Sequence, residues 1–165
     1  MKNTIILGLT LLSSIAFAQV DKIYKHSGEV VEGHVKKVGE FTVEFTYEGE
    51  DAITSLSRYA VDKIYYGKST RIEDISDKID ITDDDDWPKV IILEDKSLVA
   101  GIKKADELKS KTGWVNFRSG NGKDEKAEKR LKQQAADNRC PFILLLSDKT
   151  VGKSAKKTGT CYKYS

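Results

Sequence analysis

Few side chains in this chain of 165 residues could do chemistry, and the first candidates are metal ligands. The two histidines are His26 and His34, and a run of four carboxylates extends over Asp83–Asp86. Imidazole and carboxylate groups bind metal ions. However, both histidines stand alone, and the acids of a calcium loop alternate with other residues and include a glycine. The pattern therefore favours surface histidines and solvated carboxylates, with weak metal binding as the alternative.

Nucleophilic chemistry has little support in the sequence. Ser154 lies in a segment rich in lysine, glycine and threonine, Asp148–Thr158, beside Lys153, Lys156 and Lys157. A serine–lysine pair needs a desolvated lysine, and this segment is expected to be a solvated loop. The sequence also contains no G-x-S-x-G, H-E-x-x-H, C-x-x-C or P-loop motif. We therefore expect no enzymatic activity and no cofactor.

The remaining reactive side chains are Cys140 and Cys161. If Phe142–Ser147 and Gly159–Tyr164 form an antiparallel hairpin, both cysteines lie near its open end. A disulfide there would close a loop of about twenty residues and contribute roughly 3 kcal/mol to stability. Because the chain is expected to be exported, we predict this disulfide, and a pair of buried free thiols is the alternative.

The N-terminus has the pattern of a secretory signal peptide. Lys2 supplies the positive end, an apolar stretch follows, and Ala16-Phe17-Ala18 has the small-x-small form of a cleavage site. We expect residues 1–18 to be removed and the mature chain to begin at Gln19, in the periplasm or outside the cell. No later segment approaches the ~20 apolar residues of a membrane-spanning helix.

Charge is divided unevenly along the chain. Residues 19–86 contain 9 basic and 17 acidic side chains, a net charge of −8, whereas residues 87–165 contain 18 and 9, a net charge of +9. Two solvated domains that attract each other explain this division, and a basic half that contacts an anionic surface is the alternative. Export argues against nucleic acid, so we expect an envelope protein, an anionic glycan or a lipid headgroup as partner. The candidate contacts are Lys126, Lys129, Arg130, Lys153, Lys156 and Lys157.

The acidic half has the pattern of short antiparallel strands. Alternation is clearest over Phe41–Tyr47, where aromatic and valine side chains share one face. About five such strands are predicted before Gly67, and Gly33 is expected to mark a bulge or bend. The segments D-K-I-Y, G-E-V-V-E-G-H-V, V-E-F-T-Y and V-D-K-I-Y-Y-G resemble an SH3-like small-barrel module of exported bacterial proteins. That resemblance extends over Asp21–Lys68 and implies an antiparallel β-barrel domain, residues 19–68, without catalytic residues.

Residues 69–88 are predicted to form an acidic linker, with a short amphipathic helix possible around Ile72–Ile79. Residues 89–165 are expected to form a small α/β domain of ββαββ order. Its helix is predicted over Gly122–Asp137, because acidic residues occupy the first turn and Cys140-Pro141 follows the end. The segment 102–111 is expected to be extended.

The segments G-I-K-K-A-D-E-L-K-S-K, K-Q-Q-A-A-D, C-P-F-I-L-L-L-S-D and G-T-C-Y-K-Y resemble the compact α/β domain of the Rcs envelope-stress sensor lipoprotein family. This resemblance covers Gly101–Tyr164 and implies a disulfide-tied hairpin and an envelope location. The chain departs from the family because it lacks the lipid-bearing cysteine. We therefore expect an α+β fold and a non-catalytic envelope binding or interaction module, related to envelope stress. A small-molecule or metal-binding periplasmic protein is the alternative.

Overall fold

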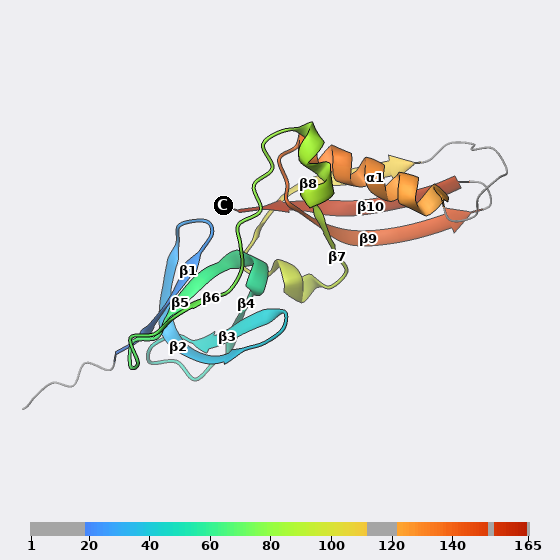
Figure 1. The fold of residues 1–165 in the computed structure, drawn as a ribbon. Helices are drawn as coiled ribbons and strands as arrows, with labels where there is room; N and C mark the ends of the chain where they lie inside the picture. The colour runs from blue at the N-terminus through green and yellow to red at the C-terminus, as the bar shows by residue number, and fades with distance from the viewer. Residues whose placement is uncertain (1–18, 112–121, 152–153, 165) are drawn as a thin grey trace, which may run out of the picture.

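A computed structural model describes residues 19–111, 122–151 and 154–164 of the chain. The predicted signal peptide lies outside these residues. The described parts form two β-sheets and one α-helix, so the fold combines mainly antiparallel sheet with a single helical layer (Figure 1). No helix in the described parts has the length and apolar character that crossing a membrane requires.

The N-terminal sheet is antiparallel and has the strand order β4-β3-β2-β1-β5-β6. Five of its strands precede Gly67, as the alternating pattern predicts. Its core consists of inward-facing apolar side chains, among which Ile23, Val43 and Phe45 are fully buried. A 3-10 turn over Arg58–Ala60 connects β4 to β5. The strands are β1 (Asp21–Lys25), β2 (Val30–Val38), β3 (Thr42–Thr46), β4 (Thr54–Ser57), β5 (Val61–Tyr65) and β6 (Ile72–Asp74).

The helix predicted as a possibility around Ile72–Ile79 is wrong, because this segment begins with strand β6. β6 pairs with β5, and beyond it the backbone N–H of Ile75 donates to the carbonyl of Asp62 at 2.8 Å. This pairing directs the Ile75 side chain into the core of the sheet. The isoleucine spacing that allowed a helix is therefore satisfied by an extended chain.

Gly33 is not the site of the irregularity in β2, which lies between Val35 and Lys37. Gly33 is required instead by a close approach of neighbouring backbone. A Cβ atom on Gly33 would lie 2.4 Å from the carbonyl oxygen of Thr46 and 3.1 Å from the Phe45 ring.

The C-terminal sheet has the order β7-β9-β10-β8, in which β7 and β9 are parallel and the other pairs are antiparallel. Helix α1 (Gly122–Asp137) has the bounds predicted from the sequence, and the segment 102–111 is extended as expected. The strands are β7 (Ile91–Leu93), β8 (Lys103–Lys111), β9 (Phe142–Val151) and β10 (Ser154–Lys163). Two 3-10 turns, η2 (Asp84–Lys89) and η3 (Lys96–Val99), flank β7.

The predicted loop Asp148–Thr158 is mostly strand, which corrects the expectation from its polar composition. β9 continues to Val151 and β10 begins at Ser154, with residues 152–153 outside the described parts. β10 also pairs with β8 as far as Lys156, opposite Lys111. Beyond that point the described residues of β9 and β10 pair only with each other, so the polar ribbon is a two-stranded hairpin whose facing backbone groups are satisfied within it.

Helix α1 packs on one face of the C-terminal sheet, and the predicted disulfide lies in that interface. Cys140 and Cys161 are bonded, with their Cα atoms 5.8 Å apart and both side chains fully buried. Leu131 and Ala135 of α1 pack in the same cluster as Ile143 of β9. The disulfide therefore connects the end of α1 to strand β10.

The other face of the C-terminal sheet packs against the 3-10 turn Arg58–Ala60 of the N-terminal half. Phe142 and Leu144 of β9 share a buried cluster with Ala60, which precedes β5. A backbone hydrogen bond also joins the two halves: the N–H of Ser57, at the end of β4, donates to the carbonyl of Ala100, which follows η3, at 2.8 Å. The two halves therefore have a common core, and the C-terminal end of the chain lies beside the β1–β2 turn (Figure 1).

Candidate functional site

A pocket of about 350 Å³ opens where the two sheets meet. Four separate segments line it: the β1–β2 turn, the chain after β6, the connection from α1 to β9, and the end of β10. We call it the junction pocket. Its titratable side chains are His26, Lys78, Asp80, Arg139, Lys163 and Tyr164.

Aromatic rings form the wall of the junction pocket and connect the two halves. The rings of His26 and Tyr164 are 5.1 Å apart, and Tyr164 meets Phe142 edge to face at 5.5 Å. Phe142 in turn packs against Tyr59 at 5.4 Å. The hydroxyl oxygen of Tyr164 also accepts a hydrogen bond from the backbone N–H of Ile79 at 3.3 Å. The Tyr164–Phe142 contact lies within the C-terminal half, and the other contacts join the two halves and hold this side of the pocket in place.

His26 is fixed by hydrogen bonds on the N-terminal side of the pocket. Its backbone N–H donates to the carbonyl of Ala60 at 3.0 Å, and its Nε2 lies 2.9 Å from Ser76 Oγ. The same Oγ contacts the carbonyl oxygens of Arg58 and Val61 at 2.9 and 2.8 Å. A serine hydroxyl has one proton, which is directed to these carbonyls. We therefore assign the Nε2–H tautomer, in which the imidazole donates to Ser76.

The environment of His26 favours its neutral form. Burial lowers the pKa of the imidazole from its ordinary value, and the charge of Lys78 lowers it further. Asp62, Asp77 and a hydrogen bond to the backbone of Ser76 act in the opposite direction without reversing the shift. At neutral pH, His26 therefore contributes a polar ring and no positive charge to the pocket.

The charges of the junction pocket are mainly positive. Lys78 Nζ lies 3.1 Å from Asp80 Oδ1, so these two charges offset each other. Arg139 and Lys163 form no ion pair with any carboxylate of the described residues. The pocket therefore presents two uncompensated cations beside a neutral imidazole and a phenol. Guanidinium and ammonium groups are donors only, which suits this arrangement to binding an anion.

Arg139 is held by the end of helix α1. The backbone N–H of Arg139 donates to the carbonyl of Ala136 at 2.7 Å, and that of Cys140 donates to Ala135 at 2.8 Å. This pair of bonds is the Schellman motif, whose left-handed position is usually a glycine. Here Arg139 occupies it at φ = 53°. A cation is favourable at this end of a helix, but the backbone conformation costs an arginine roughly 1–2 kcal/mol.

The disulfide connects two walls of the junction pocket. Cys140 lies between Arg139 and Pro141, which both line the pocket, and Cys161 lies two residues before Lys163. The covalent bond therefore fixes the backbone from which both uncompensated cations extend.

The structure places the predicted anion contacts in different environments. Lys126, Lys129 and Arg130 are exposed on α1, and Lys129 Nζ lies 4.8 Å from the centre of the Trp87 ring. Lys157 is buried, with 7% of its surface exposed, which corrects its assignment as a surface contact. Lys153 lies outside the described residues, and the side chain of Lys156 is not among those described. Of the predicted contacts whose side chains are described, Lys126, Lys129, Arg130 and Lys157, none lines the junction pocket.

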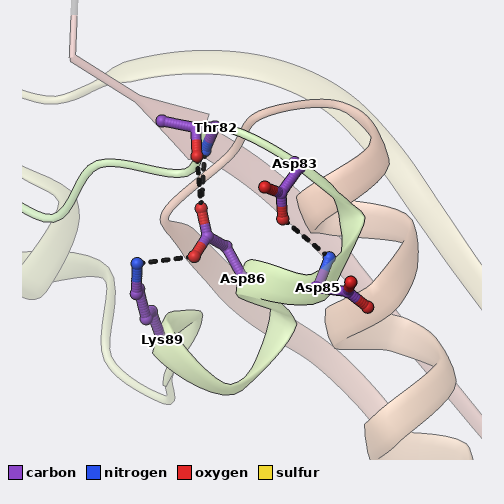
Figure 2. Close-up of polar contacts among 5 residues, drawn as sticks. All are labelled: Thr82, Asp83, Asp85, Asp86 and Lys89. Atoms are coloured by element: carbon purple, nitrogen blue, oxygen red, sulfur yellow. Dashed lines mark hydrogen bonds and ion pairs between the residues drawn. The ribbon is translucent and has the colours of Figure 1, made fainter.

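The aspartate run, which was expected to be a solvated linker, begins the 3-10 turn η2 (Figure 2). Asp83 Oδ1 accepts a hydrogen bond from the backbone N–H of Asp85 at 3.0 Å. Asp86 accepts hydrogen bonds from the backbone N–H and the hydroxyl of Thr82, both at 2.8 Å, and forms an ion pair with Lys89. These contacts lower the pKa of Asp86 far below its ordinary value, with Lys89 as the largest cause. The run therefore has a capping role.

The metal-binding alternative has no site within the described residues, because no three His, Cys, Asp or Glu side chains there converge on one point. His34 lies on β2 opposite Thr46 and is half-buried. His26, in contrast, lines the junction pocket and is hydrogen-bonded to Ser76.

Sequence reasoning missed Lys78, Arg139, Lys163 and Tyr164 as site residues. Arg139, Lys163 and Tyr164 lie at or just after the end of an element, and Lys78 lies in the connection between β6 and η2, with no motif around any of them. Only the folding of four distant segments brings them to one pocket, so no local signal in the sequence could have identified them.

Comparisons with known proteins add no assignment: no protein-family model matches this chain, and no curated protein and no solved structure matches it either.

Proposed function

We propose that this protein is a non-catalytic binding protein of the cell envelope that holds an anionic group of a glycan or lipid headgroup in the junction pocket. The observation that carries this proposal is the pair of uncompensated cations, Arg139 and Lys163, at one 350 Å³ pocket between the two sheets. Ligand sites commonly occur at such junctions, where a few polar groups converge on a concave surface.

Several other features support an envelope setting. The N-terminal pattern of a cleaved signal peptide and the buried disulfide are both typical of exported proteins. The proposal includes an SH3-like barrel in the N-terminal half and a ββαββ domain similar to that of the Rcs envelope-stress sensor family in the C-terminal half. A role in sensing or buffering envelope stress would follow from that similarity.

The junction pocket is a better anion site than the exposed face of α1. On α1, Lys132 Nζ lies 3.6 Å from Glu128 Oε1, and Lys129 lies over the Trp87 ring, so these cations already have local partners. A surface cation that is paired or solvated contributes little to binding. Arg139 and Lys163 are exposed as well, but they line one concave pocket, where two cations can act on a single anion. This comparison favours small-ligand binding over docking of a polyanion along the helix.

The test is an NMR titration of the mature, oxidised protein with inorganic phosphate and with glucuronate. We expect saturable shifts of the backbone amides of residues 26–27, 78–81, 139–140 and 163–164. Arg139→Gln and Lys163→Gln should each weaken binding about tenfold, the effect of losing one charge-assisted hydrogen bond of about 1.4 kcal/mol.

Two further variants distinguish the possible sites. Lys36→Gln removes an exposed lysine of β2, outside the pocket, and should leave both affinities unchanged. Lys126→Gln removes a cation of the α1 face. Loss of binding in Lys126→Gln with retention in Arg139→Gln would refute the junction pocket as the site.

A further inference from the structure

Resting on the function proposed above, we propose that the anion bound in the junction pocket is a phosphomonoester, a phosphate with two negative charges carried by one organic group. A carboxylate or a phosphodiester carries one negative charge, whereas a phosphomonoester approaches two at neutral pH because its second pKa is near 6.

The charge inventory of the pocket favours a dianion. The Lys78–Asp80 pair is neutral as a unit, and His26 is neutral at pH 7. Asp80 is the one carboxylate among the described residues that line the pocket, and it is paired with Lys78, while Asp62 and Asp77 act on His26 without lining the pocket. Arg139 and Lys163 then contribute two positive charges, and no carboxylate of the described residues is paired to either. A monoanion would leave one of these cations uncompensated, and a phosphomonoester would leave none.

The donor types also fit phosphate. Arg139 offers a planar fork that binds two oxygens of one phosphate, and Lys163 adds a compact charge for a third. Arg139 has a left-handed backbone conformation, in which glycine is the usual residue. An arginine side chain at this position therefore costs backbone energy. Lys163 is the last residue of β10, and it lies two residues after Cys161, which the disulfide connects to Cys140 at the end of α1.

The size and wall of the pocket indicate that the phosphate carries an organic group. A volume of about 350 Å³ exceeds what a phosphate ion fills and lies within the range of small-molecule sites. The rings of His26 and Tyr164 meet at 60°, and Ile79 lines the same pocket. The surface that lines the pocket is mainly polar, so a polar ring such as a sugar attached to the phosphate can pack on the rings of His26 and Tyr164 and hydrogen-bond to the rest of the lining.

Glucose 6-phosphate and glucuronate are similar in size and differ by one negative charge. Comparing their affinities therefore measures the effect of the second charge. We expect glucose 6-phosphate to bind about tenfold more tightly at pH 7.5, as one further charge-assisted contact implies. At pH 5.5 the phosphate is mostly singly charged, so this ratio should fall to about threefold or less. The other titratable groups at or near the pocket are His26, Asp62, Asp77, Asp80 and Tyr164, and their charge changes act on both ligands, so the ratio reports the phosphate.

A variant that preserves the fold identifies the residue responsible. Arg139→Gly places at the left-handed position the residue that it favours, so loss of binding cannot be attributed to strain there. We expect Arg139→Gly to abolish most of the preference for glucose 6-phosphate, with an unchanged or raised melting temperature. Lys36→Gln should retain the full preference, and a preference that persists in Arg139→Gly overturns the inference.

The phosphomonoester could be free or carried by a lipid, and vesicles distinguish the two sources. Flotation with vesicles that contain phosphatidic acid tests a membrane-borne monoester, and phosphatidylglycerol vesicles supply the matching diester. Retention on the first only, reversed by glucose 6-phosphate, supports a lipid-borne monoester in the same pocket. Binding of soluble glucose 6-phosphate without vesicle retention supports a free one. Equal binding of glucuronate overturns the phosphomonoester alone, whereas no binding of any of these anions overturns the proposed function as well.

Discussion

The sharpest test of the common core is the substitution Gly101→Ala. Gly101 follows η3 and has a φ of +81°, and a Cβ atom there would lie 2.4 Å from Leu56 Cδ2 and 3.5 Å from the Cβ of Ala60. Leu56 and Ala60 belong to the N-terminal half and are buried. The substitution therefore tests directly whether the two halves are in contact.

Gly101→Ala has two costs, backbone strain at a positive φ and overpacking by the new methyl group. The matched substitution Gly49→Ala has only the first. Gly49 has a φ of +79° with nothing within 4 Å of an added Cβ, so Gly49→Ala should cost only the backbone term of about 1–2 kcal/mol. Gly101→Ala should add an overpacking cost of about 1–3 kcal/mol, because Leu56 cannot move without disturbing the core. We expect a total of about 2–5 kcal/mol, with about 2–4 °C of melting temperature per kcal/mol.

Chemical unfolding of wild type, Gly49→Ala and Gly101→Ala measures these terms. The double variant Gly101→Ala/Leu56→Ala should be more stable than the sum of its single variants predicts, because the new methyl group fills the vacated space. Equal losses in Gly49→Ala and Gly101→Ala, with no coupling to Leu56, would refute the packing of the two sheets described above.

Three further predictions concern titratable groups. The pKa of His26 is lower in the folded state than in the unfolded chain, so the unfolded state binds the proton more readily. The free energy of unfolding should therefore fall as the pH drops below about 6.5. Denaturant midpoints measured at pH 7.5 and 5.5 should show this loss in wild type and not in His26→Gln. The pKa of Asp86 is lowered, so its contribution should be present above about pH 4 and lost on further acidification, and Asp86→Asn should flatten the midpoint curve in that range. Burial raises the pKa of Tyr164, and it also raises that of Tyr66, so both phenolates should appear later than the first tyrosine ionisations. The late absorbance step should be smaller in Tyr164→Phe and should be lost when Tyr66→Phe is added.

The elements that the sequence predicted correctly are those whose signals are local. The helix over Gly122–Asp137 has its acidic first turn and its apolar stripe within sixteen residues. In strand β3 the predicted inward residues Val43 and Phe45 are fully buried, whereas Phe41 and Tyr47, predicted on the same face, are exposed beyond the ends of the strand. The Cys140–Cys161 disulfide was predictable because two cysteines allow only one pairing.

The elements that sequence reasoning missed depend on partners elsewhere in the chain. Residues 148–158 have the composition of a solvated loop, but β9 and β10 pair with each other along this segment, and β8 adds a third strand at residues 156–158. Ile72–Asp74 has helical spacing, but β5 provides an edge with which it pairs. Composition describes the side chains, but whether these two segments form strands depends on the neighbouring backbone with which they can pair.

The junction pocket shows the same limit more strongly. His26 and Tyr164 are separated by most of the mature chain, and their ring contact follows only from the docking of the two sheets. Arg139 gave no signal because its unusual feature is a backbone angle, and arginine is a rare choice there. A sequence pattern could indicate a basic half, but it could not show which two cations lack an acidic neighbour.

The disulfide provides a test that connects stability to the site. Replacing Cys140 and Cys161 together by alanine opens a covalent loop with a sequence separation of 21, which should cost about 3 kcal/mol. Alanine is preferred to serine because both positions are fully buried in an apolar cluster, where a hydroxyl would need a partner.

The same pair of substitutions should weaken anion binding under conditions where the variant remains folded. Arg139 and Pro141 flank one cysteine and Lys163 follows the other, so the open form allows the two cations to separate. Calorimetric titration with glucose 6-phosphate well below the variant's melting temperature measures this effect, and Gly49→Ala serves as a destabilised control with an intact disulfide. If the alanine pair loses stability but binds as tightly as Gly49→Ala, the disulfide stabilises the fold without positioning the pocket, and the connection inferred here between crosslink and site is wrong.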